Sequence, residues 1–386
     1  MEPIPGDRSH SWVTYVWKGD SRTRGVSVVA PQVGWGELGM LDRVPRTRVW
    51  FRTFKTRNDC FGGYRFVPNP PPVPAEDSSG LGWIRLMRMA KLDPLNPITW
   101  HRAADPEHPT NPLFGTTTSI LELPKAPHHR ELEERPGVPR GKLILHRLKS
   151  RYLRNTRRIW TYSFPGETRT SRPRPMVIFF DGFGYTGAFP VRTVLDNMID
   201  GRQIPPVSAV LVDSLDLEVR ARELTGYAPF GRFLVRELLP WVRKELGFSP
   251  RPRETVLAGI SYGGLAAMYW ALRRPDLFRN VISQTGAFSW SPVGVDEPGW
   301  LTREFMRRPR LPLRIYMDVG RYEARSGPEN ELGHLAANRH LRDVLRMKKY
   351  PLFYQEFCGA HDLYCCRQTL VDALRWTLGN RRASGA

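Results

Sequence analysis

The stretch Gly259-Ile260-Ser261-Tyr262-Gly263-Gly264 decides the fold of this chain because of what lies on either side of it. An apolar run, Thr255-Val256-Leu257-Ala258, precedes it as a buried strand would, and helix-forming residues begin at Leu265. A serine in the middle of Gly-x-Ser-x-Gly, at a tight turn from a strand into a helix, forms a nucleophile elbow. The glycines have a steric reason, since such a turn leaves no room for a Cβ on either side. This context predicts Ser261 as a nucleophile, whereas the short motif alone would also suit a plain turn.

A nucleophilic serine needs a general base, and in chains with this elbow the histidine follows both the serine and the acid. Residues 353–358 form a β-rich run that ends in Gly359-Ala360-His361-Asp362, which is where such a base belongs. We therefore predict His361 as the general base, with a loop histidine without chemistry as the alternative. Of the eight other histidines, six precede Ser261, and His334 and His340 lie in a polar stretch with helical character.

The acid of such a site belongs between the serine and the histidine, just past the end of a strand. Residues 313–319 predict that strand, and Gly320-Arg321-Tyr322-Glu323 predicts the turn after it. Glu323 lies outside the strand, whereas Asp318 lies one residue inside its end, where a structural role is the alternative. We predict Glu323 rather than Asp318 as the acid. We expect Asp362 to accept from a loop amide or an arginine, because adjacent residues seldom face each other well enough to orient an imidazole.

An oxyanion hole combines the amide that follows the nucleophile with an amide from the loop after an early strand. Residues 175–180 form a continuous apolar run of the kind a buried parallel strand shows, and Asp181-Gly182 closes it. We expect the donors to be the N–H of Tyr262 and that of Gly182 or Phe183. The alternative is that Asp181-Gly182 is only a turn.

The N-terminal part of the chain has the pattern of β-structure. Short runs of β-branched and aromatic residues, separated mostly by Gly or Pro, predict a small β-sandwich. The runs are 11–17, 25–30, 48–54 and 63–67. Residues 68–139 are Pro-rich with little periodicity, which predicts a connector.

Strands and helices alternate in the rest of the chain, including a long helix expected over 230–246. Such alternation predicts a mostly parallel sheet with helices on both faces. With the elbow, the expected fold class is an α/β-hydrolase. We expect residues 141–380 to form this catalytic domain and residues 1–140 to form the accessory β-sandwich domain with its Pro-rich connector.

The chain of 386 residues carries a formal net charge of +20, and this charge is spread along its length. Diffuse basicity suits an anionic substrate, and no nucleic-acid module is recognisable; genomic base composition is the competing explanation. The N-terminus lacks the features of a signal peptide and no stretch reaches membrane-spanning length, so we expect a cytoplasmic protein without a membrane partner. The four cysteines lack zinc spacing, so we expect no protein-bound metal or cofactor. We expect them reduced and buried, with Cys365-Cys366 a redox candidate.

Several longer segments resemble the enterochelin (enterobactin) esterases, within the esterase D group of α/β-hydrolases. The matching segments are the elbow at 259–264, Arg-Arg-Pro-Asp-Leu-Phe at 273–278, Ser-Gln-Thr-Gly-Ala-Phe at 283–288, Asp-Pro-Leu-Asn-Pro at 93–97 and Gly-Ala-His-Asp-Leu-Tyr-Cys-Cys-Arg at 359–367. The resemblance spans nearly the whole chain. It departs from the family at Ala360, where a second glycine is usual, and at Cys366, where the family has Trp; both changes bear on the substrate more than on the chemistry.

The resemblance implies a serine esterase that opens the trilactone backbone of a ferric catecholate siderophore, with iron arriving on the substrate. Transferred by position, it makes Ser261 the nucleophile and His361 the base, and some relatives work with a Ser-His pair alone. An anionic ferric catecholate suits arginine side chains, and our candidates for contact with it are Arg220 and Arg367, with structural ion pairing as the alternative. An acyl transferase or a thioesterase/cyclase with the same acyl-serine chemistry is the alternative function, and a catalytically dead siderophore-binding protein is a further one.

Overall fold

The structure is a computed structural model that describes residues 1–34, 37–71, 86–166, 174–295, 298–324 and 333–379. An eight-stranded sheet forms the centre of its C-terminal part, in the order β10-β11-β13-β12-β14-β15-β16-β17. The strands are β10 (Lys142–Ser150), β11 (Asn155–Ser163), β12 (Met176–Phe180), β13 (Ser208–Val212), β14 (Thr255–Ile260), β15 (Asn280–Gln284), β16 (Arg314–Gly320) and β17 (Leu352–Phe357). The six strands from β13 to β17 in this order are parallel, and the hairpin β10–β11 joins them antiparallel at one edge.

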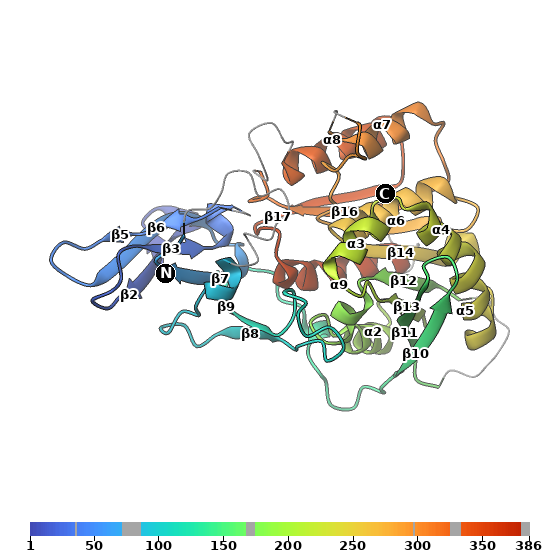
Figure 1. The fold of residues 1–386 in the computed structure, drawn as a ribbon, viewed down its shortest axis with the longest axis horizontal. Helices are drawn as coiled ribbons and strands as arrows, with labels where there is room; N and C mark the ends of the chain where they lie inside the picture. The colour runs from blue at the N-terminus through green and yellow to red at the C-terminus, as the bar shows by residue number, and fades with distance from the viewer. Residues whose placement is uncertain (35–36, 72–85, 167–173, 296–297, 325–332, 380–386) are drawn as a thin grey trace.

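Helices cover both faces of this sheet (Figure 1). They are α2 (Val191–Asp200), α3 (Leu217–Leu224), α4 (Ala228–Phe233), α5 (Leu239–Leu246), α6 (Tyr262–Arg273), α7 (Trp300–Arg307), α8 (His334–Met347) and α9 (Leu363–Leu378). The core divides accordingly, because alternate side chains of a buried strand point to opposite faces. In β12, Ile178 packs with helices α4 to α8, whereas Val177 packs with α2 and α9. The expected α/β fold with a mostly parallel sheet is confirmed.

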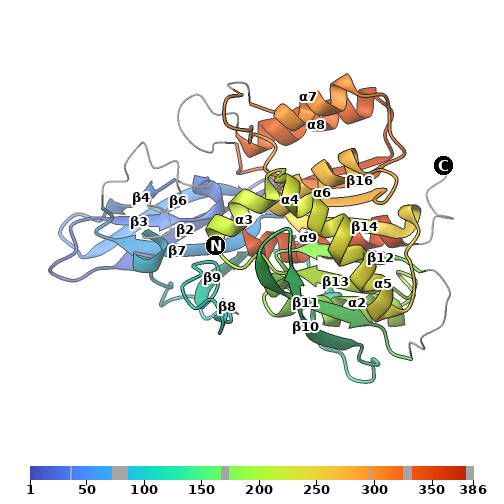
Figure 2. The same ribbon diagram turned by 45° about the vertical axis from the view of Figure 1, so that its right-hand side comes forward.

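The N-terminal part consists of two antiparallel sheets that lie to one side of the large sheet (Figure 2). One contains β1 (Glu2–Ile4), β2 (Asp7–Lys18), β6 (Val49–Arg57) and β5 (Asp42–Arg43); the other contains β4 (Gly39–Met40), β3 (Val26–Val29), β7 (Phe61–Pro68), β9 (Thr116–Glu122) and β8 (Thr99–Arg102). Tyr15 of β2 and Trp50 of β6 share a buried cluster with Val28 of β3 and Phe66 of β7. The two sheets thus bury a common core, as the expected sandwich requires.

Three sequence expectations were wrong in detail. The Pro-rich part of the chain is more than a connector, because β8 and β9 lie in it and β9 pairs with β7; its residues 72–85 lie outside the described residues. The single helix expected over 230–246 is divided by a π-helical segment, Leu234–Leu238. Helix α7 was not expected at all. Within the described residues, no helix is both long and apolar enough to cross a membrane.

Candidate active site

Ser261 lies at the sharp turn between β14 and α6. Its backbone has φ 58° and ψ −117°, a conformation that non-glycine residues adopt only under strain. Two hydrogen bonds to the segment at the end of β15 hold this conformation. The Ser261 N–H donates to the Gln284 carbonyl at 3.0 Å, and the Ser261 carbonyl accepts from the Ala287 N–H at 3.1 Å. The structure therefore has the strained strand-to-helix turn that presents a nucleophile.

The glycines around Ser261 are required by the close packing of this turn. A Cβ on Gly259 would lie 2.4 Å from the carbonyl carbon of Gly263, and one on Gly264 would lie 2.5 Å from Oγ of Ser283. Both separations are far below van der Waals contact, so a side chain at either position would force the turn apart. The steric reason expected from the sequence is confirmed for Gly259, whereas a Cβ on Gly263, the second glycine of the motif, would meet the milder contact of 3.2 Å with Oδ2 of Asp181.

His361 is paired with Glu323 at 2.7 Å, between Nδ1 and Oε2. The Glu323 side chain is 0% exposed and that of His361 is 13% exposed. The other Glu323 oxygen, Oε1, accepts from the Gly320 N–H at 2.7 Å, which fixes the carboxylate at the end of β16. A buried carboxylate with both oxygens engaged orients the imidazole ring, which is what the acid of a catalytic triad does.

Asp318, the alternative acid, lies within β16, two residues before its last residue rather than one. It is fully buried, and its oxygens accept from the Thr285 N–H and the Tyr316 hydroxyl, each at 3.1 Å. Burial raises the pKa of Asp318 to about 7. Its partners are Thr285, which follows β15, and Tyr316 within β16, whereas the carboxylate paired with His361 is Glu323.

Asp362 accepts backbone N–H groups, as expected from its position beside His361. Its Oδ1 accepts from Tyr364 at 3.0 Å, which caps the start of α9, and its Oδ2 accepts from Gly63 of β7. Other bonds join the same two regions: the Phe61 N–H donates to the Cys358 carbonyl at 3.0 Å, and the Tyr364 hydroxyl donates to Glu122 at 2.6 Å. The N-terminal sheets therefore hold the chain on both sides of His361.

His334 is a member of the site that the sequence did not reveal. It opens α8, and its ring stacks on His361 with centroids 4.9 Å apart and planes at 15°. Burial, and secondarily the nearby His361, lower the pKa of His334 to about 3, so it is neutral at ordinary pH. A neutral ring supports one face of His361 without adding a second charge. The sequence signal was only a histidine at a helix start, which is common.

The expected oxyanion donors follow the carboxyl ends of the adjacent strands β12 and β14, which pair in parallel. Asp181 has φ 65°, and the chain then turns tightly through Gly182–Thr186. Tyr262 is the first residue of α6, where backbone N–H groups point along the helix axis out of its N-terminus. This arrangement brings together the strand ends that carry Gly182 and Tyr262; their role as donors stays a prediction.

Arg220 is engaged with the protein itself. Its guanidinium forms a two-pronged pair with Asp181, at 2.7 and 2.8 Å, and also donates to the Ile260 carbonyl at 3.1 Å. Arg220 thus joins the turn after β12 to the residue before Ser261, which is the structural ion pairing weighed as the alternative. Its contact with a substrate stays a prediction, as does that of Arg367, whose guanidinium lies over the rings of Trp100 and Tyr364.

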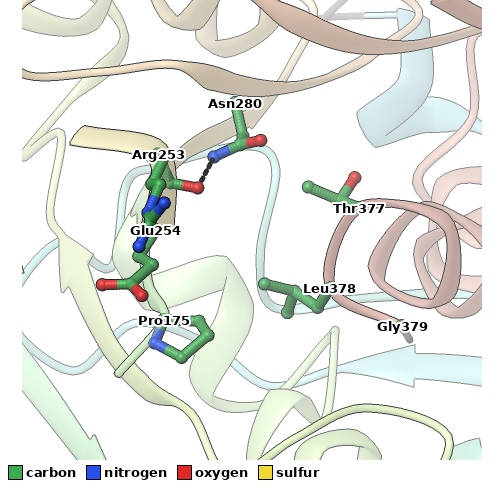
Figure 3. A pocket seen from close by; sticks show the side chains of 7 residues that line it. All are labelled: Pro175, Arg253, Glu254, Asn280, Thr377, Leu378 and Gly379. Atoms are coloured by element: carbon green, nitrogen blue, oxygen red, sulfur yellow. Dashed lines mark hydrogen bonds between the residues drawn. The ribbon is translucent and has the colours of Figure 1, made fainter. Parts of the chain in front are cut away.

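Two hollows of about 300 Å³ each lie near the amino ends of the parallel strands, away from the carboxyl ends that lead to the candidate site residues. Figure 3 shows the first, where Asn280 at the start of β15 donates to the Arg253 carbonyl. It is lined by Pro175, Arg253, Glu254, Asn280, Thr377, Leu378 and Gly379. None of the seven is a predicted site residue, because Ser261, Glu323 and His361 follow the carboxyl ends of their strands.

All four cysteines are free and buried, which confirms the expected burial. In the part of the chain that the structure describes, no group of three or more His, Cys, Asp or Glu side chains could hold a metal ion. The redox role considered for Cys365-Cys366 stays a prediction.

The fold and the candidate site are those of a carboxylic ester hydrolase built on an α/β-hydrolase scaffold. The Esterase family model matches residues 153–377, and the model of the N-terminal domain of enterochelin esterases matches residues 12–132. The chain belongs to the enterochelin esterase family.

Individual relatives agree with this assignment. The iron(III) enterobactin esterase of Escherichia coli strain CFT073 is 32% identical over 344 residues, which cover 86% of this chain and 80% of the relative. The corresponding enzyme of Dickeya dadantii is 29% identical over 88% and 79%. The crystal structure of the Shigella flexneri enterobactin esterase in the presence of enterobactin has a TM-score of 0.74, at 29% identity, covering 96% of this chain and 94% of that one.

Proposed function

We propose that this protein is a serine esterase that hydrolyses the trilactone ester bonds of a ferric catecholate siderophore such as enterobactin. The observation that carries the proposal is the His361–Glu323 pair at the same end of the sheet as the strained elbow of Ser261. Glu323 follows β16 and His361 follows β17, which are two and three strands away from β14 in the sheet. Relatives of similar length that are named iron(III) enterobactin esterases support the choice of substrate. A cytoplasmic location follows from the family resemblance and is part of this proposal.

In the proposed mechanism, Nδ1 of His361 is held by Glu323, which leaves Nε2 as the nitrogen that accepts the Ser261 proton. Ser261 Oγ then attacks the ester carbonyl. The N–H of Tyr262, with that of Gly182 or Phe183, stabilises the resulting oxyanion. His361 returns the proton to the departing serine hydroxyl of the trilactone, and a water molecule releases the acyl group by the same two steps.

Charge supports an anionic substrate. A chain with a net charge of +20 attracts a ferric tris-catecholate, which carries several negative charges. Iron arrives and leaves with the substrate in this scheme, so the protein needs no metal site of its own.

The test is the product mixture formed from enterobactin, with and without iron, in water enriched in ¹⁸O. We expect linear trimer, dimer and monomer, each new carboxylate carrying one ¹⁸O atom, because water is the final acyl acceptor. Ser261→Ala should lower turnover about a thousandfold or more while the ligand still binds. Turnover preserved in this variant would end the proposal, and products that contain an added alcohol or amine without ¹⁸O would show acyl transfer instead.

A further inference from the structure

Trp100 of β8 lies where the N-terminal sheets meet the start of α9. Its ring packs edge-to-face on Tyr364, with centroids 5.4 Å apart. The guanidinium carbons of Arg102 and Arg367 lie 5.6 and 6.0 Å from the centroid of the same ring. Trp100, Arg102 and Arg367 are each partly exposed. An indole with two cations beside it therefore contacts the helix that follows His361, although Trp100 is far from that helix in the sequence.

The two arginines carry charge that the described protein does not neutralise by an ion pair. Arg102 donates to the Thr116 hydroxyl at 2.6 Å, and Nε of both Arg102 and Arg367 is buried without a hydrogen-bond partner among the described residues. Burial lowers the pKa of both guanidiniums. Burying a cation costs free energy unless an anion pairs with it. An anionic ligand bound beside Arg102 and Arg367 would form charge-assisted hydrogen bonds with them.

The segment that follows Trp100 runs on to the other side of the site. Asp105 pairs with Arg158 of β11, at 2.8 Å, and Phe114 packs edge-to-face on Phe183 with centroids 4.8 Å apart. Phe183 belongs to the expected oxyanion turn. Residues 100–114 thus contact both the His361 side and the Ser261 side, which places them beside the carboxyl edge of the sheet.

We propose that Trp100, Arg102 and Arg367 bind one catecholate arm of the substrate, so that the accessory domain takes part in substrate binding. This rests on the proposed function. The ring of the arm packs against the indole, and its negatively charged oxygens receive hydrogen bonds from the two guanidiniums. Two of the three residues come from the N-terminal sheets, so an isolated catalytic domain lacks most of this subsite.

The test measures binding to protein that already carries Ser261→Ala, so that turnover does not interfere. The ligands are ferric enterobactin, 2,3-dihydroxybenzoyl-serine and its 2,3-dimethoxy analogue, which lacks the acidic hydroxyls. We expect Trp100→Leu to raise Kd for the two hydroxylated ligands about tenfold, and the double variant Arg102→Met/Arg367→Met to do the same. A tenfold change in Kd corresponds to about 1.4 kcal/mol of binding free energy. The arginine variants should also lose the preference for the dihydroxy over the dimethoxy ligand, a readout that a merely structural role would not move.

Arg52→Met is the matched control, because Arg52 also lies over an aromatic ring of the accessory domain, that of Phe54 at 5.3 Å, but on β6. It should leave every Kd unchanged, and circular dichroism verifies that each variant is folded. If the variants bind as tightly as the Arg52→Met control and keep the dihydroxy preference, the subsite is wrong while the esterase proposal stands. If the unsubstituted enzyme fails to cleave the trilactone, the esterase proposal itself is wrong.

Discussion

The two sides of the candidate active site are built in different ways. The elbow is held by its own sequence neighbourhood: Gly259 and Gly264 leave room for the turn, and hydrogen bonds from the next strand fix Ser261. The His361 loop is held by residues far away in the sequence, including Glu323 after β16 and Gly63 of β7. The elbow can therefore be recognised from a hexapeptide, whereas the histidine is positioned only when distant parts of the chain have come together.

The largest effect expected on the His361 side is that of Glu323→Gln. The amide retains the shape but presents an N–H toward Nδ1 of His361, which favours the wrong tautomer of the imidazole. We expect kcat to fall by about 10²- to 10⁴-fold, with KM nearly unchanged, in steady-state assays on the trilactone. A loss of less than fivefold would mean that the Ser261–His361 pair works without an acid, as the sequence resemblance allowed.

A smaller loss is expected when the link from the His361 loop to the N-terminal sheets is cut. Asp362→Ala removes the acceptor for the Gly63 N–H as well as the cap of α9, so His361 becomes less well positioned. We expect kcat to fall about tenfold beyond any change in stability. Asp216→Ala is the matched control, because Asp216 caps α3 through the Val219 N–H in the same way. Removing either cap costs about 1 kcal/mol of stability. Equal kcat in the two variants would show that the link does not position His361.

The smallest effect on activity is expected at Asp318, where the change appears in stability instead. Because burial raises the pKa of Asp318 from its ordinary value near 4 to about 7, the folded protein holds a proton there that the unfolded chain has lost. Stability therefore decreases as pH rises from about 4 to 7. Asp318→Asn mimics the protonated acid and should remove this pH dependence. The free energy of unfolding of the variant, relative to that of the unsubstituted protein, should therefore increase by about 2 to 4 kcal/mol between pH 5 and pH 8.

Denaturant unfolding at several pH values measures this difference in the free energy of unfolding. The kcat of the variant should stay within about twofold of that of the unsubstituted protein. A difference in the free energy of unfolding that does not change with pH would mean that Asp318 is ionised over the whole pH range. A loss of kcat comparable to that of Glu323→Gln would instead return Asp318 to the role of acid.

The sequence predicted those parts of the site that follow from strand-and-turn patterns. Ser261 lies at a turn whose glycines are visible in the sequence, and Glu323 lies just past the end of a regular strand. His334 could not be found this way, because its importance comes from stacking on a residue 27 positions later, which helical periodicity does not encode. Trp100 was missed for a different reason: Pro-rich flanking sequence concealed β8 and β9, whose pairing with β7 depends on tertiary contacts.

The hydrogen bond between Gly63 and Asp362 joins residues 299 positions apart, and it has a consequence for synthesis. At about 5 to 20 residues per second, the ribosome makes Asp362 roughly 15 to 60 seconds after Gly63. The N-terminal sheets and the elbow can form during that time, while the histidine segment is still missing. Each newly made molecule therefore lacks the Gly63–Asp362 link until α9 has emerged and docked, so the proposed esterase activity can begin only after the chain has been made at least to that helix.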